Sequence, residues 1–120
     1  TAQQQAKLSK RKYENDYLTF LNDLRVQVEL IRKSIMNYSE IIPINQDVVS
    51  AAEEDLKLVQ KRYSIGSATI LEVLDAQVSL IRSNSTLINT VHDARIQEMR
   101  LKALLGMLDI EYQTKEEEIK

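Results

Sequence analysis

Residues 63–77 read Tyr63-Ser64-Ile65-Gly66-Ser67-Ala68-Thr69-Ile70-Leu71-Glu72-Val73-Leu74-Asp75-Ala76-Gln77, and the rest of the chain is arranged around them. Gly66 is one of only two glycines, and the cationic residues Lys57, Lys61 and Arg62 lie shortly before it. This is typical of a helix C-terminus, because glycine accepts positive φ and cations offset the negative end of the helix dipole. Thr69 and Glu72 have the spacing of a capping box at the start of a helix. The stretch predicts a tight turn near residues 64–68 between two helices.

The composition favours long solvated helices over a compact mixed fold. The 120 residues include two glycines, one proline, one phenylalanine and no tryptophan, and 28% are charged. Such a composition provides few turns and little material for strands. The net charge is −2, with basic and acidic residues interspersed, so no nucleic-acid partner is expected. The absence of cysteine excludes disulfides and thiolate metal sites.

The sequence shows neither a membrane-spanning segment nor a signal peptide. No stretch approaches the roughly 18–20 continuous apolar residues that a membrane-spanning helix needs. The chain opens with the polar residues 1–5 and not with the apolar core of a signal peptide. The chain by itself is therefore expected to be soluble.

The first half of the chain carries an apolar repeat at alternating steps of three and four residues. The repeat consists of Tyr17, Leu21, Leu24, Val28, Ile31, Ile35, Tyr38, Ile42, Asn45, Val49, Ala52, Leu56, Val59 and Tyr63. A repeat kept over several heptads is typical of a coiled coil, in which the helix supercoils against a partner helix. We therefore expect a descending helix over residues 1–63. We call these repeat positions the seam. Asn45, their only polar interruption, either fixes the register between the two helices or hydrates a distorted turn.

Pro43 is the main objection to a single first helix. An interior proline removes one hydrogen bond and clashes with the carbonyl of Ser39, at a cost of about 3 kcal/mol. A helix that restarted after it would have an arbitrary phase, yet the apolar register continues unshifted from Ile42 into Val49. We therefore expect a kink at Pro43 within one long helix. The alternative is a separate helix over residues 44–63 in a compact three-helix bundle.

The second half, expected to be a return helix over residues 69–113, carries two apolar stripes. The stripe near the turn comprises Ile70 or Leu71, Leu74, Val78, Ile81 and Ile88, and the other comprises Leu80, Leu87, Val91, Ala94, Leu101, Leu105 and Leu108. A helix that packs between two neighbours needs such a wide face, whereas a simple hairpin needs one narrow seam. The pattern fits a multi-helix wall or a four-helix bundle of two hairpins. Residues 114–120 are expected to form a frayed tail.

The turn and the helix after it resemble the periplasmic hairpin tip of the TolC-type outer membrane efflux and export channels, the outer membrane factor family. The likeness rests on Tyr63, Gly66 and residues 69–77, and it continues to a closing Leu-Gly-Met-Leu at residues 105–108. Upstream, residues 51–58 resemble the descending helix just before the tip. The resemblance covers about residues 48–110, and the earlier residues match only by pattern.

The resemblance implies an all-α fold, a long antiparallel helical hairpin that forms a coiled coil. It also implies a function as part of the periplasmic tunnel of an efflux or secretion channel, a passive export conduit at the cell outer membrane. Such channels are homotrimers that dock a periplasmic adaptor, or membrane fusion protein, and work with an inner membrane transporter. The chain would meet the membrane only through parts absent here. As a fragment it could instead form a hairpin dimer.

The resemblance assigns roles to residues at the tip. The residues that match the adaptor-docking tip are Ile65, Gly66 and Ser67, and those that match the gate or constriction are Tyr63, Glu72 and Asp75. Glu72 and Asp75 from three subunits would form a carboxylate ring that attracts cations. From spacing alone, the same two residues equally fit a solvated helix face, and Tyr63 fits the last residue of the seam. Ala68 departs from the family, because the best-known member has a gate arginine at this place.

No catalytic residue, cofactor or metal site is predicted. The chain offers no nucleophile and base pair, phosphate loop or metal cluster, so an enzyme is not expected. The single histidine, His92, has no second nitrogen or thiolate ligand beside it in the sequence. The alternative function is a coiled-coil scaffold or dimerisation module unrelated to transport. A signal peptide and strands of alternating polarity in the parent gene would favour the channel.

Overall fold

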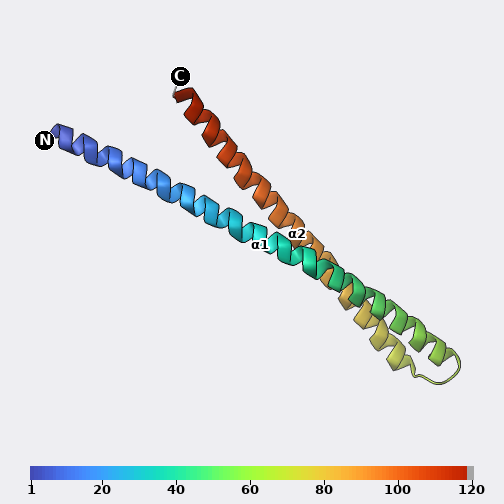
Figure 1. The fold of residues 1–120 in the computed structure, drawn as a ribbon. Coiled ribbons are helices and arrows are strands. Elements are labelled where there is room, and N and C mark those ends of the chain that lie inside the picture. Colours follow the sequence, from blue (N-terminus) through green and yellow to red (C-terminus); the bar gives the residue numbers. More distant parts are fainter. Residues whose placement is uncertain (119–120) are drawn as a thin grey trace. The chain divides into compact units, whose positions relative to one another are not determined.

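The computed structural model describes the backbone of residues 1–118, and it consists of two α-helices joined by a short turn (Figure 1). Helix α1 spans Ala2–Ser64 and helix α2 spans Ile70–Glu118. Side chains are described except at residues 111, 112 and 116–120. No strand lies within residues 1–118. The predicted all-α helical hairpin is confirmed.

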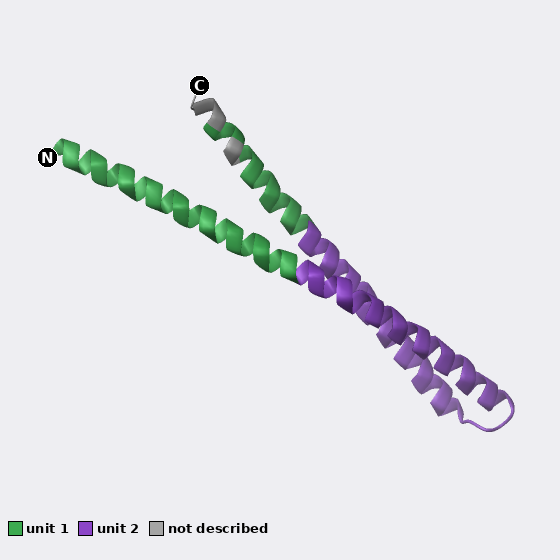
Figure 2. Cartoon of the chain, viewed as in Figure 1, with its two compact units in different colours: residues 1–33, 99–120 green, residues 34–98 purple. Residues whose placement is uncertain are grey.

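Both helices contribute to each of two compact units (Figure 2). Unit 1 comprises residues 1–33 and 99–120, and unit 2 comprises residues 34–98, including the turn. In unit 1, the ammonium group of Lys115 on α2 lies 5.1 Å from the ring centre of Tyr17 on α1. In unit 2, α1 and α2 run antiparallel on either side of the turn, and this unit contains all the predicted site residues.

Helix α1 is unbroken at Pro43. The predicted single long helix is therefore confirmed, and the alternative of a separate helix over residues 44–63 in a three-helix bundle is wrong. The physical reason is the apolar seam, since ending the helix at the proline would take every later seam residue out of phase with its partner. A kink at Pro43 stays a prediction.

The seam of α1 lies where the sequence placed it. Every predicted position from Tyr17 to Val59 is buried or half-buried, whereas the last one, Tyr63, is 48% exposed. In unit 2 the best-buried part of the seam is a small cluster near the tip, formed by Val59, Val73 and Ala76. These side chains are only 6–8% exposed, so they fix how the two helices approach one another beside the turn.

On α2 the structure separates the seam from a second stripe. The seam residues of α2 in unit 2 are buried or half-buried, and they include Val73, Ala76, Leu80, Ser83, Leu87, Thr90 and Ala94. The stripe predicted near the turn points elsewhere, because Leu74, Val78 and Ile81 are 47–65% exposed. In unit 1, Leu105 is exposed and Leu104 lies in the seam position instead. The two predicted stripes are thus two different faces of α2.

Helix α2 is longer than the sequence predicted. It continues to Glu118, past the expected end at residue 113, so the expected frayed tail from residue 114 is helical as far as the structure describes it. No glycine or proline follows Gly106, and glutamine, lysine and glutamate are good helix formers, so nothing in the sequence stops the helix. Residues 119 and 120 lie outside the described residues.

Candidate functional site

Helix α1 ends in a turn built around Gly66. The φ of Gly66 is 77°, as predicted for a left-handed glycine. Its N–H donates to the carbonyl of Tyr63 at 3.0 Å, and the N–H of Ser67 donates to the carbonyl of Arg62 at 2.7 Å. These two bonds form a Schellman motif, which satisfies carbonyls that the end of a helix leaves without partners. The turn therefore has a defined backbone conformation.

Helix α2 begins with the predicted capping box. The N–H of Thr69 donates to Glu72 Oε2 at 2.7 Å, and the N–H of Glu72 donates to Thr69 Oγ1 at 3.3 Å. Two amides that precede the first helical hydrogen bonds are thereby satisfied. Glu72 Oε2 caps the start of the helix, and Glu72 Oε1 is available to another partner.

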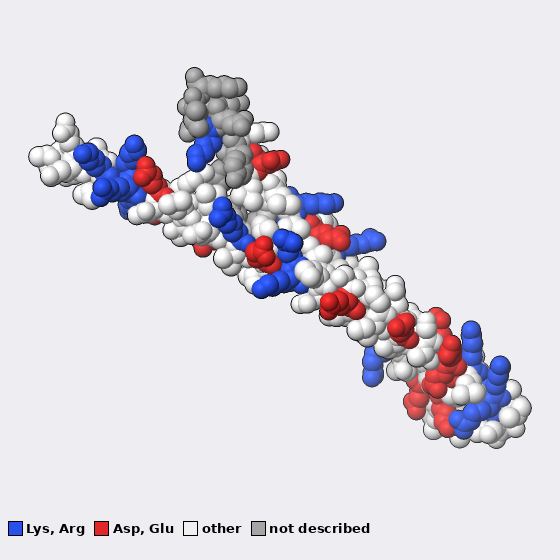
Figure 3. All heavy atoms as spheres, in the orientation of Figure 1, with Lys and Arg blue, Asp and Glu red and all other residues white. Residues whose placement is uncertain are grey.

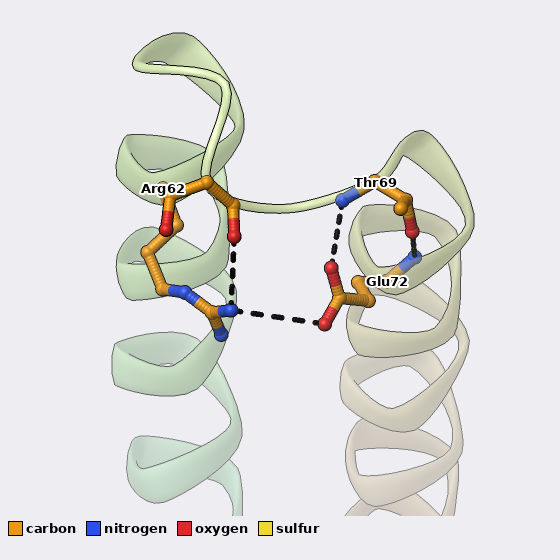
Figure 4. A network of polar contacts seen from close by, with 4 residues as sticks. Arg62, Thr69 and Glu72 are labelled. Atoms are coloured by element: carbon orange, nitrogen blue, oxygen red, sulfur yellow. Dashed lines mark hydrogen bonds and ion pairs between the residues drawn. The ribbon is translucent and has the colours of Figure 1, made fainter.

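That partner is Arg62, a residue that sequence reasoning counted only as a cation near the end of α1. Its Nη2 lies 3.8 Å from Glu72 Oε1 and donates to the carbonyl of Ser67 at 3.1 Å. Figure 4 shows the guanidinium of Arg62 facing the Glu72 carboxylate between the end of α1 and the start of α2, with Thr69 above that carboxylate. No spacing rule within one helix could have found this contact, because the turn lies between the two residues.

The docking residues predicted from the family lie on the exposed part of the turn. Ile65 is 79% exposed, so its aliphatic side chain is open to solvent. A Cβ added to Gly66 would meet no atom within 4 Å, so the backbone there is open to a neighbour. Ser67 is also exposed. Their role in docking is not decided by this exposure and remains a prediction.

The predicted constriction residues lie on both helices. Tyr63 is the last seam residue of α1 and is half-exposed, and Glu72 and Asp75 are exposed on α2. Glu72 forms an ion pair with Arg62, whereas Asp75 has no ion pair within the described residues. Near the tip, acidic and basic side chains lie close together on the surface shown in Figure 3. Ala68 packs against the buried cluster of Val59, Val73 and Ala76, where an arginine would have to bury its charge.

The described residues contain no group of three or more histidines or carboxylates that could hold a metal ion. His92 is exposed on α2. Neither helix, over the residues that the structure describes, has a stretch long and apolar enough to cross a membrane.

Comparison with known proteins accounts for this hairpin. A profile described as "Outer membrane efflux protein" matches residues 1–107. The chain belongs to the outer membrane efflux protein family. Family membership confirms the resemblance read from the turn, and it agrees with the predicted location at the outer membrane, with this helical segment in the periplasm.

Two relatives show how much of an efflux protein this chain represents. The chain is 34% identical over 89 residues to Outer membrane protein TolC of Escherichia coli (strain K12), a match that covers 71% of the chain and 18% of that protein. Outer membrane protein TolC of Salmonella enteritidis matches with the same identity and coverage. The match thus spans less than a fifth of the length of these relatives. No solved structure matches it significantly.

Proposed function

We propose that this hairpin forms part of the periplasmic tunnel of a trimeric outer membrane efflux channel. The channel is a passive conduit and not an enzyme, and it docks a periplasmic adaptor through Ile65, Gly66 and Ser67 at the tip. The adaptor in turn connects the channel to an inner membrane transporter. Family membership supports efflux, and one feature of unit 2 supports the tunnel wall.

That feature is a pair of exposed apolar stripes, one on each helix. The stripe of α1 comprises Ile41, Ile44, Val48 and Leu58, and the stripe of α2 comprises Ile70, Leu74, Val78, Ile81 and Ile88; each of these side chains is 41–66% exposed. Full burial of a large aliphatic side chain contributes roughly 1.5–3 kcal/mol. Two apolar rows that are exposed in the isolated hairpin indicate surfaces that other protein surfaces cover in the assembly.

The two stripes lie on opposite sides of the hairpin. Arg62 and Glu72 each precede a seam residue by one position, and their contact shows that these positions share one side of unit 2. The α1 stripe also precedes the seam by one position, so it lies on that side. The α2 stripe follows the seam, as Leu74 follows Val73, so it lies on the other side.

A hairpin with an apolar row on each side packs between two neighbours. A single partner, as in a simple hairpin dimer, would cover one row and leave the other in water. Repeated head-to-tail packing forms a ring where the rotation between neighbours closes, and a closed ring of helices is a tunnel. The sidedness of the stripes therefore supports a tunnel wall over an isolated scaffold.

The wall can be tested by placing the same charge on and off a stripe in the complete channel. Val48→Lys puts an ammonium group in the α1 stripe, and Glu54→Lys puts one on the face of α1 that points away from the seam; both positions are exposed in the hairpin. We expect Val48→Lys to abolish the trimer in native gels and drug export in cells, and Glu54→Lys to retain both. Full assembly of Val48→Lys would contradict the proposal.

The constriction can be tested with cysteines, because the chain has none of its own. We expect Asp75→Cys to cross-link between subunits under oxidation and to block export until a reductant is added. Gln60→Cys is the control, since it lies near the same level on α1 and on the opposite side from Asp75. Unimpeded export through a channel cross-linked at residue 75 would show that Asp75 does not line the narrowest part.

A further inference from the structure

Ser67 is held by a single residue through both of its backbone polar groups. Its N–H donates to the carbonyl of Arg62 at 2.7 Å, and its carbonyl accepts from Arg62 Nη2 at 3.1 Å. In many Schellman motifs, the two residues at the positions of Arg62 and Ser67 make an apolar contact. Here the contact is polar, and it adds a side-chain bond to the backbone bonds that already shape the turn.

The same guanidinium extends this hold to the second helix. Arg62 Nη2 lies 3.8 Å from Glu72 Oε1, while Glu72 Oε2 accepts from the N–H of Thr69 at 2.7 Å. The contacts therefore run from the last turn of α1, through the middle of the turn, to the first residue before α2 (Figure 4). Of the turn residues 65–69, only Ala68 packs against the buried cluster of Val59, Val73 and Ala76. Polar contacts therefore hold most of the turn.

We propose that Arg62 is a positioning residue that holds the tip turn in one conformation before a partner docks on it. This inference rests on the proposed docking role of Ile65, Gly66 and Ser67. Ordering a loop upon binding costs conformational entropy, and a turn that is already ordered avoids that cost. Because the arginine acts on the turn of its own hairpin, the effect needs no contact between subunits.

The magnitude is modest, because the side chains of Arg62 and Glu72 are 44% and 46% exposed. Solvent screens an ion pair at such a site, and the hydrogen bond to Ser67 contributes most of the effect. The helices themselves should not depend on the Arg62 side chain, since the Schellman bonds use backbone groups and the capping box uses the side chains of Thr69 and Glu72. The effect should therefore appear in the order of the turn and not in helix content.

The first measurement is amide hydrogen exchange at Ser67 and Thr69 in the 120-residue chain. Arg62→Met keeps most of the aliphatic stem and removes the donors, and we expect exchange at both amides to accelerate roughly fivefold. Arg62→Lys restores the charge with a single donor group and should recover part of the protection. Glu72→Gln keeps an acceptor for Thr69 and removes the ion pair, so it should accelerate exchange less than Arg62→Met.

Arg32→Met is the matched control. Arg32 makes a similar exposed ion pair with Glu29, at 3.6 Å, but within α1 and away from the turn. It should leave exchange at Ser67 and Thr69 and adaptor binding unchanged. Equal exchange in Arg62→Met and wild type, with helix content preserved, would overturn the role of Arg62.

The second measurement is the affinity of the complete channel for a purified α-helical hairpin from a periplasmic adaptor. We expect Arg62→Met to weaken binding roughly fivefold, mostly through slower association, and Arg62→Lys to recover part of it. If wild type binds and Arg62→Met binds equally well, the positioning role is wrong. If wild type does not bind, the proposed docking function fails instead, and the exchange measurement still decides whether Arg62 orders the turn.

Discussion

Asn45 on α1 donates a hydrogen bond from its Nδ2 to Thr90 Oγ1 on α2 at 3.0 Å, in the half-buried seam of unit 2. The hydroxyl of Thr90 in turn donates to the carbonyl of Thr86 at 2.8 Å. The sequence left two roles open for Asn45, and the structure gives it a partner across the seam. A polar pair in an apolar seam favours the one register in which both groups are satisfied.

Replacing Asn45 by leucine should loosen the register between α1 and α2 without lowering the free energy of unfolding. Thr90 keeps Thr86 as its acceptor, so no donor is stranded, and we expect the free energy of unfolding to stay the same or rise by about 1 kcal/mol. The distance distribution between spin labels at the exposed residues Glu53 and Arg82 should broaden, because other registers become accessible. Thr90→Ser keeps the hydroxyl and should keep the narrow distribution. An equally narrow distribution in Asn45→Leu would contradict a role in register.

Replacing Pro43 by alanine should stabilise α1. The helix runs through Pro43, which lacks an N–H and cannot bond to the carbonyl one turn earlier. We expect the free energy of unfolding, measured by urea titration, to rise by up to about 3 kcal/mol. Ser50→Ala, at another exposed position of α1, should change it by less than about 0.5 kcal/mol. A loss of stability in Pro43→Ala would mean that the seam needs the distortion that proline imposes.

The two glycines should respond to alanine with opposite signs. A Cβ at either Gly66 or Gly106 meets no atom within 4 Å, so sterics with neighbours do not decide the outcome. Gly66 has a φ of 77°, and alanine there should lower the free energy of unfolding by about 1–2 kcal/mol. Gly106 lies inside α2, where alanine should raise it by about 1 kcal/mol. The same sign at both positions in a urea titration would refute this reading of the backbone.

The neighbours Leu58 and Val59 should separate the seam from the outer stripe. Val59 is 8% exposed and Leu58 is 57% exposed. Val59→Ala should cost the isolated chain about 1–2 kcal/mol of unfolding free energy. Leu58→Ala should cost it less than about 0.5 kcal/mol but should weaken the assembled channel, seen as a lower dissociation temperature of the trimer. A larger loss for Leu58 in the isolated chain would place that residue inside the hairpin.

The sequence alone determined the local features of this protein. The apolar repeat from Tyr17 to Val59 predicted the buried face of α1, because heptad spacing fixes which residues share one side of a helix. Gly66, Thr69 and Glu72 predicted the turn and the start of α2, since each acts on backbone groups a few residues away. The same local residues carried the likeness to the outer membrane efflux family.

Only the tertiary structure decided which face of α2 meets α1 and what Arg62 contacts. The α2 seam mixes leucines such as Leu80 with small and polar residues such as Ser83 and Thr90, while other large aliphatic side chains lie on the outer stripe. The sequence pattern of one helix shows which of its faces are apolar. It does not show which apolar face packs against the other helix of the hairpin and which packs against another neighbour. The contact between Arg62 and Glu72 depends on how the turn brings two helix ends together, and no spacing within either helix encodes that approach.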